Sequence, residues 1–531
     1  MPTFSRQAGI VFVLLLVFTI PTSGQDTEES ALPEIFSEPM PIFSKALGEF
    51  KRPISSDDPE AQAYFDQGFQ MMYAFAKQDA TRSFREAWKR DPDCAICYWG
   101  EAWSWGSYLN GPMRGSEAPH AFVAIQKALE LAEQASPKER AFIGAMEVRY
   151  VDDFDPDKRV DQDRAYADAM RGVSEQYPND LDAATLYADS LFLMEPRQGT
   201  RDLNDPDLQR LHGVLEGILD RDIRHPGACH LYIHATESTV EPGKAEACAE
   251  YIGNSIPGAS HINHMPSHTW NEIGLWGNSV RANIQAWHSD LKAEIGEGFA
   301  IYPSHNLHML LFAASMDGQG GLAIQAGKDY AKLTGNNMYH ILTLVRFGRF
   351  HEIPAITERP EGTVTAGMWD FGQGYARLRA GETAFARAHL ARVVEGAESS
   401  ENFRRHSAKH LLGTMAGILE GEIHRESGEL TRAIASFERA VALEDELEYD
   451  EPEPMPFSAR HWLGAALLEA KRYQDAERVY REELEDHPHN GWSLFGLLEA
   501  LRAQGKSSPE VEGDFTESWA RSDTWIRGSR F

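Results

Sequence analysis

The sequence predicts an all-α protein, built as a solenoid of stacked helical hairpins. From about residue 58 onward, Ala, Leu, Glu and Arg recur with the 3.6-residue period of amphipathic helices. No run of alternating β-branched residues predicts a strand. Turns recur roughly every 12 to 18 residues, as in helical repeats. At 531 residues the chain is too long for one ordinary compact core, which also favours a repeat array or several domains.

Individual helices can be recognised in order along the chain. One is expected over residues 63–75 and the next over 79–92, where Asp91-Pro92 ends the pattern because proline cannot continue a helix. Two later segments, 421–440 and 463–480, place small and aromatic residues at the positions where paired helices pack closely. In the first of them these residues are Gly428, Ala433, Phe437 and Ala440.

These segments resemble the tetratricopeptide repeat (TPR) family, most closely near residues 420–505 and less closely at 60–92. The resemblance implies a right-handed superhelix whose concave face binds a protein or peptide partner. The expected organisation is a signal peptide at 1–24, an acidic Pro-rich leader at 25–58, N-terminal repeats at 59–200, His-rich degenerate repeats at 201–320, further repeats at 321–420 and C-terminal TPR repeats at 421–531.

The N-terminus and the overall charge restrict location and partners. Arg6 precedes an apolar stretch at 10–20 and small residues up to Gly24, which is the pattern of a secretory signal. The stretch is short for a membrane span, so we expect an exported protein, periplasmic or extracellular, with no span after signal removal. The formal net charge of −30 opposes binding to nucleic-acid phosphates. The oligomeric state is left open.

Four cysteines suit an oxidising compartment. Cys94 and Cys97 form a C-x-x-C motif, and Cys229 and Cys248 are the second natural pair. A disulfide is the first interpretation of each pair. The alternatives are a redox pair or half of a metal site for the C-x-x-C motif, and a metal-binding thiolate for Cys229.

The chemical signal of the sequence is a cluster of histidines. Nine of the 20 histidines lie between His225 and His308, many at the three-, four- and seven-residue spacings that share one helix face. The motif PGACH at 226–230 recurs as PGASH at 257–261, so the histidines follow the repeat. The candidate metal ligands are His230, His234, His261, His264, His268, His305 and His308. His225 and His288 lack a partner at helical spacing and are interpreted as surface or core residues.

Several neighbours of the histidines have more than one interpretation. Glu237 shares a face with His234 and is a candidate ligand, an orienting residue or a general base. Pro266 suggests that a helix begins near Met265 and that His261 and His264 lie in the preceding loop. Met265 is either a soft metal ligand or a core residue. Tyr302 and Asn306 are candidate hydrogen-bonding partners.

The leading hypothesis is an exported TPR-type scaffold that binds a protein or peptide partner and carries a histidine-rich transition-metal site, with Zn, Cu or Fe as the ion. One ion with supporting histidines and two ions are both open. The second hypothesis is a metal-dependent hydrolase or oxidoreductase that uses the same histidines, with Glu237 as base. The third is an interaction scaffold in which the histidines form a metal-free polar network.

Overall fold

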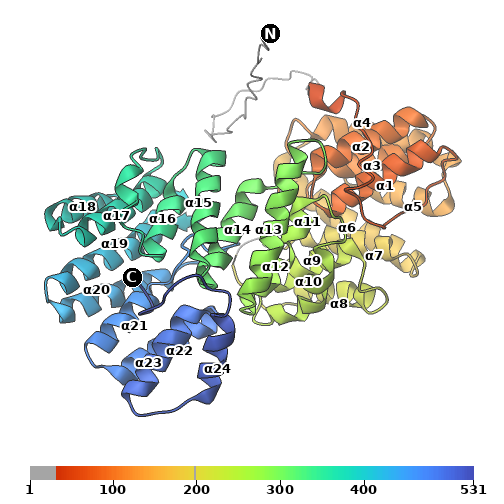
Figure 1. The fold of residues 1–531 in the computed structure, drawn as a ribbon. Coiled ribbons are helices and arrows are strands. Elements are labelled where there is room, and N and C mark those ends of the chain that lie inside the picture. Colours follow the sequence, from red (N-terminus) through yellow and green to blue (C-terminus); the bar gives the residue numbers. More distant parts are fainter. Residues whose placement is uncertain (1–31, 196–198) are drawn as a thin grey trace, which may run out of the picture.

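The computed structural model describes residues 32–195 and 199–531, which are almost wholly helical (Figure 1). Each helix packs on its neighbours in the chain, so that successive hairpins stack side by side. The prediction of an all-α solenoid is therefore confirmed. The predicted signal peptide lies outside the described residues. In the part of the chain that is described, no helix is both long enough and apolar enough to cross a membrane.

The helices of the first half of the chain are α1 (Pro59–Tyr73), α2 (Lys77–Arg90), α3 (Ala95–Trp105), α4 (Ala118–Glu130), α5 (Pro137–Glu147), α6 (Arg159–Gln176), α7 (Leu181–Phe192), α8 (Pro206–Leu219), α9 (Pro226–Thr236), α10 (Glu246–Ile252), α11 (Ser260–His264) and α12 (Pro266–Glu272). The helices predicted at 63–75 and 79–92 correspond to α1 and α2. The first begins earlier because the Asp58 side chain caps it, accepting hydrogen bonds from two backbone N–H groups of the first turn.

The helices of the second half are α13 (Trp276–Ala293), α14 (Pro303–Met316), α15 (Gly320–Thr334), α16 (Met338–Arg346), α17 (Thr363–Arg379), α18 (Thr383–Ala397), α19 (Ala408–Glu426), α20 (Leu430–Glu444), α21 (Arg460–Glu469), α22 (Tyr473–Asp486), α23 (Gly491–Ala503) and α24 (Pro509–Ser518). Short 3-10 helices lie at Glu34–Phe36, Ala132–Gln134, Pro156–Lys158, Pro242–Ala245 and Ile353–Ala355. The sequence predicts no strands, but the structure has a small hairpin of β1 (Asn402–Phe403) and β2 (His406–Ser407).

The buried apolar residues form two cores that meet in the middle of the chain. The first core runs from Met40 to Ile301 and the second from Trp276 to Val511. Helices α13 and α14 stand at the junction, between the two lobes visible in Figure 1. The histidine-rich region belongs to this junction, since its helices contribute apolar side chains to one core or the other.

Residues 32–58, predicted as an acidic leader, pack against the helices. The hydroxyl of Tyr64 donates to the carbonyl of Met40 at 2.7 Å, and the N–H of Gly258 donates to the carbonyl of Ala46 at 2.8 Å. Arg52 reaches α7, where it forms ion pairs with Asp180 and Asp182. The segment therefore ties α1, α7 and the approach to α11 together.

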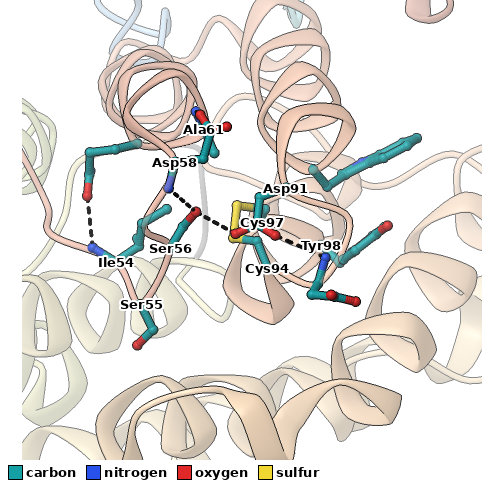
Figure 2. Close-up of a disulfide and its surroundings, with 12 residues drawn as sticks. Ile54, Ser55, Ser56, Asp58, Ala61, Asp91, Cys94, Cys97 and Tyr98 are labelled. Carbon is teal, nitrogen blue, oxygen red and sulfur yellow. Dashed lines mark hydrogen bonds between the residues drawn. A yellow bond between two sulfur atoms is a disulfide. The ribbon is translucent and has the colours of Figure 1, made fainter.

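Both cysteine pairs are disulfides. Cys94–Cys97 closes the first turn of α3, beside the segment that leads into α1 (Figure 2). There the Ser56 hydroxyl donates to the Asp91 carboxylate at 2.5 Å, which joins this segment to the end of α2. Cys229–Cys248 links α9 to α10. The alternative of a Cys229 thiolate as metal ligand is thereby wrong, because its sulfur is bonded to Cys248.

Helix α9 approaches α1 closely because Gly227 has no side chain. A Cβ atom placed at Gly227 would lie 2.4 Å from the ring of Tyr73, far inside normal contact. Pro226 occupies the first position of α9 and the His225 side chain caps it, accepting from the N–H of Ala228 at 3.1 Å. The PGACH motif is thus a helix start that fits tightly against α1.

Replacing Gly227 with Ala should destabilise the protein, because the added methyl group overlaps the Tyr73 ring. Overpacking of this kind costs about 1–3 kcal/mol, measurable as a lower midpoint of chemical denaturation followed by circular dichroism. Gly217→Ala in α8 is the matched control: no atom lies within 4 Å of its added Cβ, so alanine should raise helix stability by about 0.5–1 kcal/mol. Equal midpoints for the two variants would contradict the close packing of α9 on α1.

Candidate metal centre

Six of the seven candidate histidines meet at the junction of the two cores. They come from four helices that lie together near the centre of Figure 1: His230 and His234 from α9, His261 and His264 from α11, His268 from α12 and His305 from α14. Neighbouring imidazole rings have centroids 4.7 to 6.3 Å apart. The repeat phase that relates the motifs in sequence therefore corresponds to convergence in space.

Pro266 divides the histidines of the middle motif between two short helices. The sequence suggests that His261 and His264 lie in a loop before the helix, but the structure places them on α11, Ser260–His264. Pro266 then occupies the first position of α12, which carries His268. A proline cannot donate the hydrogen bond that a continuous helix would require, so the helix breaks and restarts. The break keeps all three histidines on the same side.

The ring nitrogens form two sets of three, each compact enough to bind one ion. One nitrogen from each of His230, His234 and His261 lies within 4.8 Å of the others, and the same holds for His264, His268 and His305. A further grouping joins His234, Glu237, His268 and Glu451. It involves histidines already present in the two sets, so the two trihistidine sets are the basic units of the site.

Glu237 fixes the orientation of one histidine in each set. The Nδ1–H of His234 donates to Oε1 of Glu237 at 2.8 Å, and the Nδ1–H of His268 donates to Oε2 at 2.5 Å. An ionised carboxylate only accepts hydrogen bonds, so both Nδ1 atoms carry a proton, and in the neutral form of each ring Nε2 then has the lone pair. This carboxylate–histidine arrangement is typical of metal sites. With both oxygens engaged and only 2% exposure, Glu237 fits the orienting role rather than that of a general base.

His230 is oriented by the backbone. Its Nδ1–H donates to the carbonyl of Tyr73 at 2.6 Å, which leaves Nε2 as the unprotonated nitrogen. That Nε2 lies 3.1 Å from Nε2 of His261, while Nδ1 of His261 lies 2.9 Å from Nε2 of His264. The close fit of α9 on α1 at Gly227 therefore sets the position of the His230 ring.

A metal-free network leaves buried nitrogens without partners. Nδ1 of His264 and Nε2 of His268 are buried and make no hydrogen bond to any residue of the described segments. An unsatisfied buried polar group costs about 1–3 kcal/mol, and native structures contain few of them. A cation bound by these lone pairs would satisfy both nitrogens.

Burial keeps most of these histidines neutral, as metal ligands must be. Burial, followed by the neighbouring imidazoles, lowers the pKa of His261 and His264 well below the usual value. The pKa values of His230 and His305 are lowered in the same way. Burial also opposes the charged form of His268, but the carboxylates of Glu237, Glu451 and Glu272 together outweigh burial and raise the pKa of this imidazole.

A pocket of about 540 Å³ opens onto the histidines. Its wall consists of Asn110, His234, His261, Tyr302, Ser304, His305, Arg404, Arg405, Asp450 and Glu451. Members of both trihistidine sets therefore face the same space. The volume is in the range of small-molecule sites.

Backbone strain is concentrated around this pocket. Six non-glycine residues of the described segments have positive φ, and four of them surround the site: Phe75, Tyr302, Arg404 and Arg405. The Phe75 ring packs on His230 with centroids 4.2 Å apart, and the Tyr302 ring meets His261 edge-on at 5.1 Å. Left-handed backbone is unfavourable for such residues and tends to occur at functional sites.

The seventh candidate, His308, lies apart from both sets. A guanidinium N–H of Arg404 donates to Nδ1 of His308 at 2.5 Å, so Nδ1 is the acceptor and the ring proton resides on Nε2. Asn306 donates to Asp290 at 2.8 Å. Met265 is fully buried in the first core, as its interpretation as a core residue requires. His225 caps α9, and His288 is exposed on α13.

Sequence reasoning missed Arg404, Arg405, Asp450 and Glu451. They lie more than 90 residues beyond His308, in the β1–β2 turn and in the loop before α21. No motif or helical spacing connects them with the histidines. Two consecutive arginines in a short polar segment are the only signal, and such a pair is common on protein surfaces.

Comparison with known proteins identifies no family, since no family model and no curated protein matches the chain. Similar solved structures include a human IFIT1 dimer with m7Gppp-AAAA (10% identity, TM-score 0.31, 80% of this chain and 90% of that chain). Yeast Tom70 has 14% identity and a TM-score of 0.30, over 88% of this chain and 93% of its own. The TPR domain of P58(IPK) has 12% identity and a TM-score of 0.22, over 84% and 98%. At this level of similarity no function transfers.

The lowered pKa of His261 leads to a pH-dependent stability difference in the metal-free protein. The folded chain keeps this imidazole neutral while the unfolded chain protonates it, so the stability that depends on neutral His261 is complete above about pH 6.5 and lost below it. As the pH falls below about 6.5, the free energy of unfolding of wild type should therefore decrease more than that of His261→Gln. The difference between the two should change by up to about 1.4 kcal/mol per pH unit.

Urea denaturation near pH 7.5 and near pH 5.5, with chelator present, measures this difference. His288→Gln, on the exposed side of α13, serves as the control because its ring is in water in both states. An identical difference between wild type and His261→Gln at the two pH values would contradict the neutral state of the buried imidazole.

Proposed function

We propose that this chain is a metalloenzyme in which a helical-hairpin solenoid holds two transition-metal ions, each bound by three histidines, beside a pocket for a small molecule. The observation that carries the proposal is the Glu237 carboxylate. It accepts hydrogen bonds from one histidine of each set and so aims two lone pairs away from itself. Nε2 of His268, with no hydrogen-bonding partner among the described residues, is one of them.

The donor set favours copper. Six imidazoles suit copper, zinc, iron and nickel, and among divalent ions nitrogen ligands bind copper most tightly. Non-haem iron sites of the two-histidine type add a carboxylate ligand, whereas the Glu237 oxygens here face Nδ1–H groups. Copper would give the site oxidative chemistry, and zinc would make it hydrolytic.

The pocket supports an enzymatic role over a purely structural metal. Three protein ligands leave an open position on each ion, which is the arrangement of catalytic rather than structural sites. His234, His261 and His305 line the pocket, so ions held by the two sets would supply their chemistry to a molecule bound there. Binding of a protein or peptide partner elsewhere on the solenoid remains part of the proposal. So does export, which the two disulfides support because they persist in oxidising compartments.

Metal analysis of the purified protein tests the proposal. Native protein, or protein refilled after chelation, should contain about two copper ions per chain by elemental analysis, because two trihistidine sets are present. A chain with one ion at saturation would overturn the two-ion assignment, and a chain with none would overturn the metal centre.

Two substitutions test how the ligands are arranged. Glu237→Gln should weaken metal binding by about 10- to 100-fold. The amide has a single acceptor oxygen and no negative charge, so it cannot orient both Nδ1–H groups as the carboxylate does. His308→Asn should leave the metal content at about two ions per chain, because Arg404 already occupies its Nδ1. Loss of an ion in His308→Asn, or unchanged affinity in Glu237→Gln, would contradict the assignment of these residues.

A further inference from the structure

The turn between β1 and β2 has a backbone that its side chains do not favour. Phe403 pairs with His406, so Arg404 and Arg405 are the two loop residues of the hairpin. Their φ angles are 51° and 85°. Two-residue hairpin turns with positive φ at both positions strongly prefer Asn-Gly or Gly-Gly. Two arginines accept this conformation at a cost, which indicates that the guanidinium groups are needed where the turn places them.

The contacts of Arg404 explain why an arginine occupies the first position of the turn, because its guanidinium group is used in hydrogen bonds to the protein. It donates to Nδ1 of His308 on α14, to Oδ1 of Asp450 at 2.7 Å and to the carbonyl of Glu451 at 2.7 Å. The other oxygen of Asp450 accepts from Nε2 of His406 at 3.1 Å. Arg404 thus joins the hairpin, α14 and the loop before α21 into one wall of the pocket.

Arg405 has no comparable anchor. Its nearest carboxylate oxygen is Oδ1 of Asp450, at 3.8 Å, and that oxygen already accepts from Arg404. Its side chain is 36% exposed and lines the pocket together with His261 and His305. Asp450 already accepts hydrogen bonds from Arg404 and His406, so the charge of Arg405 is left for a ligand.

We propose that Arg405 binds the carboxylate of a small organic acid, which places the rest of that molecule against the histidines. This inference rests on the proposed function and names the substrate class of the same pocket. A guanidinium matches a carboxylate with two parallel hydrogen bonds. The Glu451 carboxylate also lines the pocket, 3.8 Å from Nδ1 of His268. It opposes a doubly charged phosphate more than a singly charged carboxylate.

Calorimetry with the full chain tests the proposal. It measures the binding of three probes: benzoate, phenyl phosphate and benzyl alcohol. The chelated, metal-free protein is used first, so that an anion cannot bind through the metal. Benzoate should bind more tightly than phenyl phosphate, and benzyl alcohol should not bind measurably. Tighter binding of phenyl phosphate overturns the carboxylate assignment, and equal binding of benzyl alcohol overturns charge recognition.

Arg405→Gly separates binding from folding. Glycine fits the positive φ, so this variant should be at least as stable as wild type while benzoate affinity falls at least about tenfold, as for loss of a charge-assisted pair. Arg405→Lys should keep part of the affinity. The matched control is Lys471→Gly, which removes another exposed cation with positive φ, 59°, far along the chain. It should bind benzoate as wild type does. Unchanged benzoate binding in Arg405→Gly overturns the proposal.

Metal content measured on untreated or metal-refilled portions of the same preparations distinguishes the two proposals. Two ions per chain without benzoate binding overturn the role of Arg405 and leave the metal centre in place. If the chain takes up no metal but binds benzoate in a way that depends on Arg405, the carboxylate site is supported and the metalloenzyme proposal is overturned.

Discussion

The carboxylate of Glu237 is the contact on which the histidine cluster depends. It stands at the end of α9 and accepts from His234 of its own helix and His268 of α12, with 2% of its surface exposed. A buried carboxylate of this kind is tolerable only with full hydrogen bonding, and the two Nδ1–H groups supply it. The same two bonds determine which nitrogen of each ring carries the donated proton. One buried carboxylate therefore holds two helices together and orients two histidines.

The surrounding packing makes this arrangement rigid. Gly227 lets α9 settle on α1, where the Tyr73 carbonyl orients His230, and the disulfide at Cys229 fastens α9 to α10. The site lies where two apolar cores meet, so side chains from both lobes reach it. Such a junction brings together elements far apart in sequence while each core remains intact. This accounts for a pocket whose histidines come from one part of the chain and whose arginines come from another.

The strained residues around the pocket are consistent with a functional site at the junction of the two cores. Phe75 and Tyr302 have left-handed backbone conformations, and their rings pack on imidazole rings of the cluster. Arg404 and Arg405 have the same conformation in a turn where glycine would be more favourable. Strain persists where the surrounding structure imposes it, and it tends to gather at functional sites. Here the strained positions lie in three separate segments, so a single irregular loop does not explain them.

The sequence alone determined the helices and the choice of histidines. The 3.6-residue period, the prolines and the small residues act locally, so they predict α1, α2 and the hairpins without knowledge of the rest of the chain. Repeated motifs ending at His230 and His261 gave the phase of the cluster, because repeats stack in register. Only the tertiary structure decided that Glu237 orients two histidines, that His308 contacts Arg404, and that Arg405 lines the pocket. Those roles depend on contacts between residues 31 or more positions apart, or on which nitrogen carries a proton, and neither is encoded in local spacing.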